Sequence, residues 1–433
     1  MLIASLSGQN VHPLSILPFV LLLAMIAGMP FINKHWWEQH YPKVAFGLGL
    51  ISIIYYGFVL NNWGRVWHTA QEYMSFIALI GSLFVVSGGI HIVVKGEATP
   101  FRNCVFLLIG AVLSNFIGTT GASMLLIRPW IRMNRYRITA FHIVFFIFIV
   151  SNVGGCLTPI GDPPLFLGYL KGVPFWWVLE HCWEAWAIGL IFLLSIFYII
   201  DQRDFLRAPA EIRQKETAVE KWKISGFSNL VFLSIILISV FISTPLFLRE
   251  ALMVGSAVGS YLLTPKSVHQ ANGFTFTPIK EVAWLFLGIF ATMIPALDYL
   301  SINAQQGKIP LHSEMQYYWL TGILSGVLDN APTYLTFLTA SLGMFGLSLD
   351  NPHHVLIYLR DHDHHLIAIS LGAVFFGAMT YIGNGPNFMV KSISQEAEVK
   401  VPSFFGYLVK YSIPILLPVF FLIGLIFFKF RIF

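Results

Sequence analysis

The chain has 433 residues, of which 56% are hydrophobic and 11% are charged. Soluble domains carry about 25% charged residues, so this composition excludes an ordinary soluble protein. The apolar segments are about 17–25 residues long, which suits helices across a ~30 Å hydrocarbon core, whereas the strands of an outer-membrane barrel would be about 10 residues long. Basic residues in loops account for the net charge of +5, which calls for no nucleic-acid partner. We therefore predict an all-α polytopic membrane protein.

The apolar segments predict a series of membrane elements along the chain. The first begins near Leu14 without a basic n-region or an A-x-A cleavage site, so we expect a retained helix and not a signal peptide. Residues 201–224 are the one long polar stretch, and they predict a charged, partly helical linker. The predicted elements cover about 14–32, 44–60, 74–94, 101–128, 138–170, 183–200, 227–245, 250–264, 282–298, 317–347, 366–395 and 404–428.

Two of these segments, 101–128 and 317–347, have small and polar centres. The centres read SNFIGTTGAS and LDNAPTYLT, which suits the tip of a re-entrant hairpin better than a helix that faces lipid. With both as hairpins and the N-terminus outside, 19 of the 26 Lys and Arg residues fall on the cytoplasmic side, as the positive-inside rule requires. We therefore predict ten crossings and two hairpins in the cell inner membrane, with the linker in the cytoplasm.

The two halves of the predicted topology repeat one pattern: three spans, a hairpin and two spans. Because each half has five crossings, the second half starts on the opposite side of the membrane, which makes an inverted repeat. We predict the first repeat in residues 1–200 and the second in residues 225–433, separated by the linker 201–224. Each repeat contains one broken helix, at about 138–170 and about 366–395.

A short sequence match supports this repeat. TPIGDPPLF at 158–166 aligns without gaps with TYIGNGPNF at 380–388, and Asp162 then matches Asn384. At the hairpin tips, we match the pair SN with the pair DN. These pairs are Ser114-Asn115 and Asp329-Asn330.

Two carboxylates lie deep in the predicted membrane elements, Asp162 in a broken helix and Asp329 at a hairpin tip. A charge at the bilayer centre costs about 2.5–3.5 kcal/mol on insertion scales, so such residues are functional candidates. Paired Gly/Pro breaks also mark the binding sites of transporters. We expect Asp162 and Asp329 to bind Na⁺ or protons. The neutral oxygen donors expected around them, which suit a hard monovalent cation, are Ser114, Asn115, Thr119, Thr120, Ser151, Asn152, Thr158, Asn330, Thr333, Asn384 and Asn387.

A site made of carboxylates and neutral oxygen atoms, with little positive charge nearby, favours cations over anions. Lys391, the nearest basic residue, is expected to extend to the cytoplasmic face. Competition between Na⁺ and protons for one carboxylate would couple the two fluxes directly. The three cysteines show neither a metal pattern nor a disulfide framework. We expect no cofactor, with Na⁺ as the transported ion.

Two further groups of residues are given no transport role. Glu184 and Asp298 lie near the ends of predicted spans and are expected to be interfacial acids. NPHHVLIYLRDHDHHL at 351–366 contains five histidines and is expected to be a solvated loop. A divalent-metal or pH-sensing patch is the alternative there, because histidine titrates near neutral pH.

Four motifs carry a resemblance to a known superfamily. It is the ion-transporter superfamily of dicarboxylate/sodium symporters, citrate carriers, arsenite permeases and NhaD-type Na⁺/H⁺ antiporters. The likeness is closest to the antiporters, because of PIGD at 159–162 and DNAP at 329–332. It implies that Asp162, Asp329 and Asn330 bind the ion. It also implies a homodimer in the lipid bilayer, with a scaffold domain and a transport domain that moves as an elevator. The motifs are SNFIGTT (114–120), TPIGDPPLF (158–166), LDNAPT (328–333) and TYIGNGPNF (380–388).

Other functions remain as alternatives. The first tip has Ser114-Asn115 where the antiporter pattern has Asp-Asn, a form nearer the Ser-Asn-Thr signature of the dicarboxylate symporters. A Na⁺-coupled citrate or dicarboxylate carrier is therefore the second interpretation, and Li⁺ is the alternative ion in either. An arsenite-type carrier follows. A membrane aspartyl protease of the Gly-x-Gly-Asp form would need glycine where this chain has Ile160, and the sequence has no Walker signature of a pump. We expect a carrier and not an enzyme.

Overall fold

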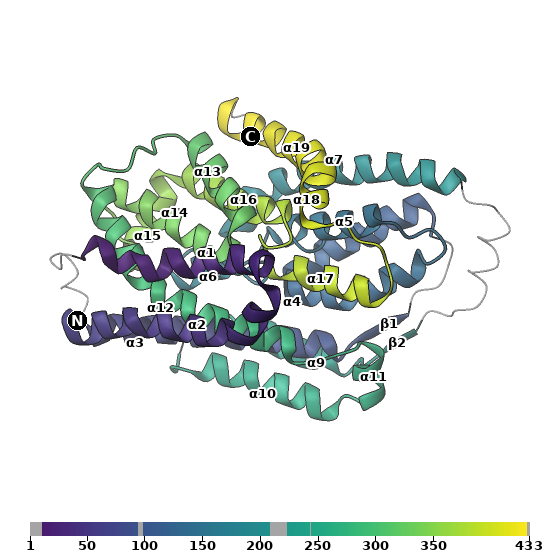
Figure 1. Cartoon of the computed structure of the whole chain (residues 1–433), viewed down its shortest axis with the longest axis horizontal. Helices are drawn as coiled ribbons and strands as arrows, with labels where there is room; N and C mark the ends of the chain where they lie inside the picture. The colour runs from purple at the N-terminus through teal and green to yellow at the C-terminus, as the bar shows by residue number, and fades with distance from the viewer. Residues whose placement is uncertain (1–10, 94–97, 208–222, 243, 431–433) are drawn as a thin grey trace.

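The computed structural model describes residues 11–93, 98–207, 223–242 and 244–430. The described chain is almost entirely helical, with one two-stranded antiparallel sheet in which His91 pairs with Ser225. Figure 1 shows the helices as one elongated bundle. The first part of the chain forms α1 (Leu17–Ile32), α2 (Lys34–Ile54), α3 (Trp63–Gly88), β1 (His91–Val93), α4 (Pro100–Met133), α5 (Ala140–Ile149), α6 (Pro163–Leu170) and α7 (Trp177–Arg207).

The rest of the chain continues the bundle after β2. Its elements are β2 (Lys223–Ser225), α9 (Asn229–Ser239), α10 (Leu248–Leu263), α11 (Lys266–Ala271), α12 (Thr277–Gln305), α13 (Glu314–Val327), α14 (Asn330–Met344), α15 (Pro352–Asp361), α16 (Asp363–Phe376), α17 (Gly385–Glu396), α18 (Phe404–Tyr407) and α19 (Leu417–Gly424). Short 3₁₀ or π segments are Pro13–Ile16, Tyr55–Val59, Val153–Gly155, Gly377–Met379, Leu408–Leu416 and Leu425–Lys429.

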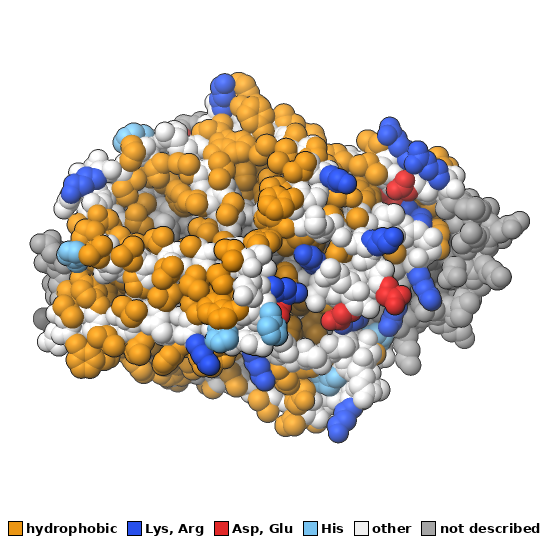
Figure 2. All heavy atoms as spheres, in the orientation of Figure 1, with side chains coloured by type: hydrophobic (Ala, Val, Ile, Leu, Met, Phe, Trp, Pro, Cys, Tyr) orange, Lys and Arg blue, Asp and Glu red, His pale blue; other side chains and the backbone are white. Residues whose placement is uncertain are grey.

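By length and composition, seven helices of the described residues could cross a membrane. Hydrophobic side chains cover much of the left and middle of the face shown in Figure 2, as expected of a protein surrounded by lipid, and charged side chains gather toward its right. The chain is a multi-pass membrane protein. The seven helices are Pro13–Ile32, Lys34–Val59, Trp63–Gly88, Pro100–Met133, Trp177–Arg207, Thr277–Gln305 and Phe404–Lys429.

One of these seven, α4, folds back on itself at Gly118. This glycine has φ 74° and ψ 155°, a conformation that interrupts the helix and that side chains disfavour. The amides of Asn103 and Asn134 hydrogen bond to each other, and the rings of Phe106 and Trp130 stack with centroids 5.4 Å apart. A straight helix would separate residues 31 positions apart by about 46 Å. The two arms of α4 therefore run antiparallel.

Helices α13 and α14 form a second reversal of the same kind. Leu328 and Asp329 between them have extended backbone, and the Tyr317 hydroxyl donates to Met344 Sδ across the pair, 3.0 Å away. Two irregular stretches complete the interior: one lies between α5 and α6, and the other between α16 and α17. Proline in the first turn of α6 and of α17 fixes where each helix restarts.

Helices α2, α3 and α12 lie side by side along one edge of the bundle, with α10 against α3 (Figure 1). Small residues allow the close approach of α2 and α12, where a Cβ on Gly49 would lie 3.1 Å from Ala291 Cβ. The rings of Phe76 and Phe286 stack between α3 and α12, with centroids 4.6 Å apart. These three helices contribute nothing to the polar site described below.

Several predicted boundaries are wrong. The predicted spans at 44–60 and 74–94 begin earlier, because α2 starts at Lys34 and α3 at Trp63. Asn33 breaks the chain between α1 and α2, and its side chain accepts a hydrogen bond from the Trp36 N–H.

The polar segments also differ from expectation. The sequence predicts Asp201 in the polar linker, but the residue is fully buried in α7, which continues to Arg207. The linker residues 208–222 lie outside the described residues. The histidine-rich stretch 351–366 is not a loop, because it forms α15 and the start of α16. His362, between the two helices, stacks its ring on Phe345.

Candidate functional site

Asp162 lies in the interior at the point where α6 begins. It is the residue before the helix, with φ −140° and ψ 143°, and Pro163 and Pro164 follow it as the first two helical residues. Proline suits these positions because its fixed φ matches the helix and its missing N–H would have no helical partner. The side chain is 1% exposed. The Gly-Asp-Pro-Pro sequence thus forces the backbone to unwind and presents the carboxylate at a helix N-terminus.

Three donors from three other segments hold this carboxylate. Thr119 Oγ1 and Asn384 Nδ2 donate to Asp162 Oδ1 over 2.8 and 2.9 Å. Asn330 Nδ2 donates to Asp162 Oδ2 over 2.6 Å. Thr119 follows the break in α4, Asn330 begins α14, and Asn384 precedes α17. Hydrogen bonds to an ionised acceptor are the strong ones, so this cage stabilises the carboxylate form.

A second set of amides joins the two broken helices behind the cage. Asn384 Nδ2 also lies 3.2 Å from the Ser151 carbonyl and from Asn152 Oδ1. Asn152 Nδ2 donates to Asn387 Oδ1 over 2.7 Å, and Asn387 Nδ2 donates to the Thr380 carbonyl. The residues between α5 and α6 are therefore fixed to those between α16 and α17.

Four of the predicted site residues instead secure backbone. Thr158 Oγ1 donates to the Asn115 carbonyl and Asn115 Nδ2 to the Gly154 carbonyl, while Ser114 Oγ donates to the Val150 carbonyl. Thr333 Oγ1 donates to the Asp329 carbonyl within its own helix. These side chains shape the cage without touching the carboxylate. Thr120 is half-buried beside Thr119.

Asp329 occupies a position different from that of Asp162. Its Oδ1 accepts the Ala331 N–H over 3.0 Å and so caps the N-terminus of α14. Among the described residues, no hydrogen bond joins the carboxylates of Asp329 and Asp162. Its neighbour Asn330 has Oδ1 buried without a hydrogen-bond partner in the described chain. A buried carbonyl oxygen left in this way is a free acceptor next to the caged carboxylate.

The two reversals make similar side-chain contacts. Ser114 Oγ donates to the Val150 carbonyl, and Ser325 Oγ donates to the Ala373 carbonyl. Thr158 Oγ1 donates to the Asn115 carbonyl, and Thr380 Oγ1 donates to the Gly326 carbonyl. These pairs align SNFIGTT with SGVLDNA at 325–331.

This alignment differs by four residues from the predicted match of the pairs SN and DN. Asn330 then corresponds to Thr119, which also donates to Asp162. The SN and DN pairs are similar in sequence, but Ser114-Asn115 precede the break in α4, whereas Asp329-Asn330 lie at the break between α13 and α14.

Sequence reasoning missed a buried ion cluster, which consists of Arg65, Glu72, Lys171, Asp298 and Asp350. The Lys171 ammonium lies 2.8 Å from Glu72 Oε1 and 2.9 Å from Asp350 Oδ1. Arg65 lies 2.7 Å from Asp350 Oδ1 and 2.8 Å from Asp298 Oδ1. Asp298, predicted to be an interfacial acid, is thus ion-paired, with 17% of its side chain exposed. One signal was available: Arg65 and Lys171 both fall in the outside group of the predicted topology.

Comparison with known proteins adds two findings. A protein family described as "Putative citrate transport" has a model that matches residues 8–428. The chain is also similar to a "46 kDa membrane protein" of Mycobacterium leprae (strain TN), with 23% identity over 317 residues, which covers 70% of this chain and 72% of that protein.

Proposed function

The chain belongs to that family of membrane transporters, and from this premise we propose that it exchanges Na⁺ for H⁺ across the inner membrane by alternating access. The observation that carries the proposal is the cage of Asp162, a buried carboxylate held by one hydroxyl and two amides from both halves of the chain. None of the ion pairs among the described residues includes it. A carboxylate without a basic partner must bind a cation or a proton to be neutral.

The proposed cycle uses this competition. On one side of the membrane Na⁺ binds Asp162 and displaces its proton, and on the other side a proton displaces Na⁺. The unpartnered Asn330 Oδ1 and the Ser151 carbonyl supply neutral oxygens near the carboxylate. Asp329 keeps a second negative charge at the tip of α14, where it lowers the energy of a cation in the cage.

The matched contacts of the two halves support an inverted repeat. On this proposal the hairpins α4 and α13–α14 and the broken helices carry the ion, and α2, α3 and α12 belong to the scaffold on which they move. Broken helices at corresponding positions in two halves are the arrangement in which transporters hold ions at the membrane midplane.

A specific observation also favours a second function, Na⁺-coupled uptake of citrate or a similar carboxylate. Helix α6 begins directly after Asp162, and α17 begins directly after Asn384, which donates to Asp162. Helix α14 begins at Asn330, which also donates to Asp162. Helix N-termini carry partial positive charge and bind anions. The description of the family points the same way.

The test is ion flux in proteoliposomes with a pH-sensitive dye inside. After a pH gradient is imposed, addition of NaCl should dissipate it in the wild type and not in Asp162→Asn or Asp329→Asn. Asp361→Asn is the matched control, because Asp361 is an exposed acid paired with Arg360, and its activity should equal that of the wild type. Uptake of labelled citrate on addition of Na⁺, with no Na⁺-driven proton movement, would contradict the antiport proposal and support Na⁺-coupled symport.

A further inference from the structure

The ion cluster joins elements that carry the site to elements that do not. Lys171 lies at the end of α6, the helix that begins at Asp162, and its side chain is 5% exposed. Asp350 follows α14, the helix that begins at Asn330. Lys171 is therefore connected to the carboxylate cage through the eight residues of α6, and Asp350 through α14 and the residues 345–349 that follow it.

Lys171 and Asp350 pair with residues on helices that do not carry the site, and we call the contact between these two groups of elements the boundary. Glu72 and Arg65 lie on α3, and Asp298 lies on α12. Arg65 is bonded to α12 through Asp298, and the Tyr56 hydroxyl donates to the same carboxylate over 2.7 Å. The pairs that cross the boundary are Glu72–Lys171 and Arg65–Asp350.

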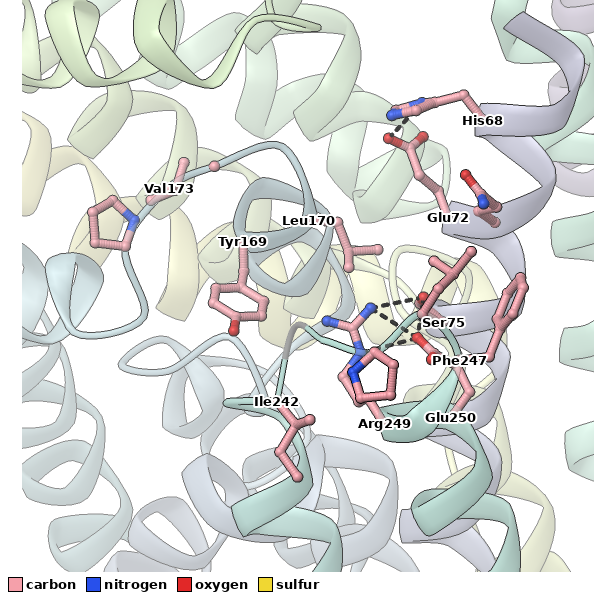
Figure 3. A pocket seen from close by; sticks show the side chains of 15 residues that line it. His68, Glu72, Ser75, Tyr169, Leu170, Val173, Ile242, Phe247, Arg249 and Glu250 are labelled. Carbon is pink, nitrogen blue, oxygen red and sulfur yellow. Dashed lines mark hydrogen bonds and ion pairs between the residues drawn. The ribbon is translucent and has the colours of Figure 1, made fainter. Parts of the chain in front are cut away.

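A cavity borders the cluster. Its volume is about 430 Å³, and Glu72, Tyr169 and Leu170 are among its lining residues. Figure 3 shows Glu72 extending from α3 toward His68, while Arg249 bonds Ser75 and Glu250, which also line the cavity. Buried ion pairs are costly to separate without water, and this cavity can hydrate Glu72 and the end of α6 when the pairs part.

We propose that this ion cluster is a clasp that holds α6 and α14 against α3 and α12 in the present conformation and opens in every transport cycle. The inference rests on the proposed alternating access but not on which ion or substrate is carried. Ion pairs of 2.7 to 2.9 Å lose their geometry when the elements slide by a few ångströms. Motion of the cage relative to α3 and α12 therefore requires the two crossing pairs to break.

The first experiment closes the clasp covalently. The natural cysteines are replaced by alanine, and two cysteine pairs are compared in proteoliposomes with a short cross-linker that a reductant cleaves. The crossing pair is Glu72→Cys with Lys171→Cys. The matched control is Lys171→Cys with Asp350→Cys, in which both residues lie on the side that carries the site.

The cross-linked crossing pair should stop whichever flux the wild type carries, and reduction should restore it. The cross-linked control pair should keep its flux. Unchanged flux through the cross-linked crossing pair, equal loss in both pairs, or failure of the crossing pair to cross-link would overturn the clasp. If the wild type shows neither Na⁺-driven proton movement nor citrate uptake, it is the proposed function that fails.

The second experiment needs no substitution. During turnover in wild-type protein, an amine-reactive reagent should modify Lys171, as detected by mass spectrometry, and modification should be several-fold slower without substrate ions. The exposed Lys43 serves as the reference, because it should react equally in both conditions. A Lys171 that remains unmodified while flux proceeds would contradict an opening clasp.

Discussion

Asn330 Nδ2 lies 2.6 Å from Asp162 Oδ2, although the two residues are 168 positions apart in the chain. This contact connects the tip of the second reversal to the broken helix of the first half. It also leaves the other atom of the amide, Asn330 Oδ1, without a partner in the described chain. One residue thus offers a donor to the carboxylate and an acceptor to a cation.

Replacing Asn330 with alanine should weaken apparent Na⁺ affinity. A hydrogen bond to a charged group contributes about 1.5–3 kcal/mol, so the affinity should fall by roughly tenfold to a hundredfold. Dye-detected flux at increasing NaCl concentration measures it. Thr336→Val is the control, because Thr336 Oγ1 bonds only the Pro332 carbonyl of its own helix, and an equal effect there would count against a specific role.

Gly118→Ala should destabilise the protein. At φ 74° the added Cβ is strained, and it would lie 3.3 Å from the Ile160 carbonyl oxygen. Strained backbone of this kind costs about 1–3 kcal/mol, which should lower the unfolding temperature in detergent by several degrees. Gly47→Ala is the comparison, since Gly47 lies in α2 with nothing within 4 Å of its Cβ position, and it should leave the temperature unchanged or raise it. Equal Tm values for both variants would contradict a strained reversal.

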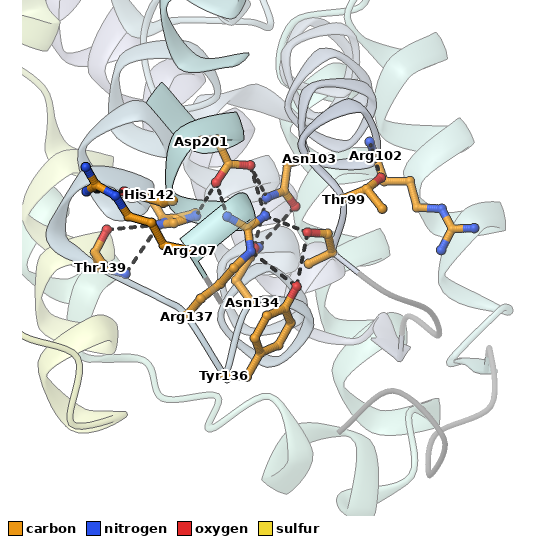
Figure 4. A network of polar contacts seen from close by, with 12 residues as sticks. Thr99, Arg102, Asn103, Asn134, Tyr136, Arg137, Thr139, His142, Asp201 and Arg207 are labelled. Carbon is orange, nitrogen blue, oxygen red and sulfur yellow. Dashed lines mark hydrogen bonds and ion pairs between the residues drawn. The ribbon is translucent and has the colours of Figure 1, made fainter. Parts of the chain in front are cut away.

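A second buried network should be sensitive to loss of one charge. Asp201 is fully buried. It accepts hydrogen bonds from Asn103 near the start of α4, from Arg137 after the end of α4, and from His142 in α5 (Figure 4). Asp201→Asn leaves the Arg137 guanidinium without its counter-charge, which should cost about 3–5 kcal/mol. Thermal unfolding should show a marked loss of stability, whereas Asp204→Asn, at a partly exposed acid, should show little.

The clasp should be stable across the neutral pH range. Burial raises the pKa of Asp350, but Lys171 and Arg65 outweigh it and hold that pKa well below its usual range. Burial lowers the pKa of Lys171, but Glu72 and Asp350 outweigh it and raise that pKa. A depressed acid contributes stability above its unfolded pKa of about 3.9 and loses it as pH falls further, and a raised lysine loses its contribution only above about pH 10.4.

The difference in Tm between wild type and Asp350→Asn tests this expectation. It should be constant from about pH 6 to about pH 9 and shrink only below about pH 4. A difference that changes steeply near neutral pH would show that another group titrates in the clasp.

The sequence predicted the location of the site better than its surroundings. Asp162 lies between glycine and two prolines in an apolar stretch. The free-energy cost of a charge in the membrane was enough to identify it as a functional candidate. Thr119, Asn330 and Asn384 were named as candidates, and the structure brings all three to the carboxylate. The similar positions of Thr119 and Asn330 at the carboxylate could not be read from the sequence, because the two residues differ in type.

The ion cluster was missed for another reason. Its members are separated in sequence: Arg65 and Glu72 lie in α3, Asp298 lies in α12, and Lys171 and Asp350 follow α6 and α14. Only the packing of α3 against α6 and α12 buries them together. Helix boundaries were also misplaced where polar residues such as Lys34 and Arg65 continue a helix, because hydropathy marks the apolar portion of a helix and not its full length.

The most direct test of the central claim is proton release on Na⁺ binding to the purified protein. In weakly buffered detergent solution, addition of NaCl should release protons from the wild type, and Asp162→Asn should release none. Asp361→Asn should match the wild type. Na⁺ binding without proton release, or equal release from Asp162→Asn, would contradict exchange of Na⁺ and H⁺ at this carboxylate.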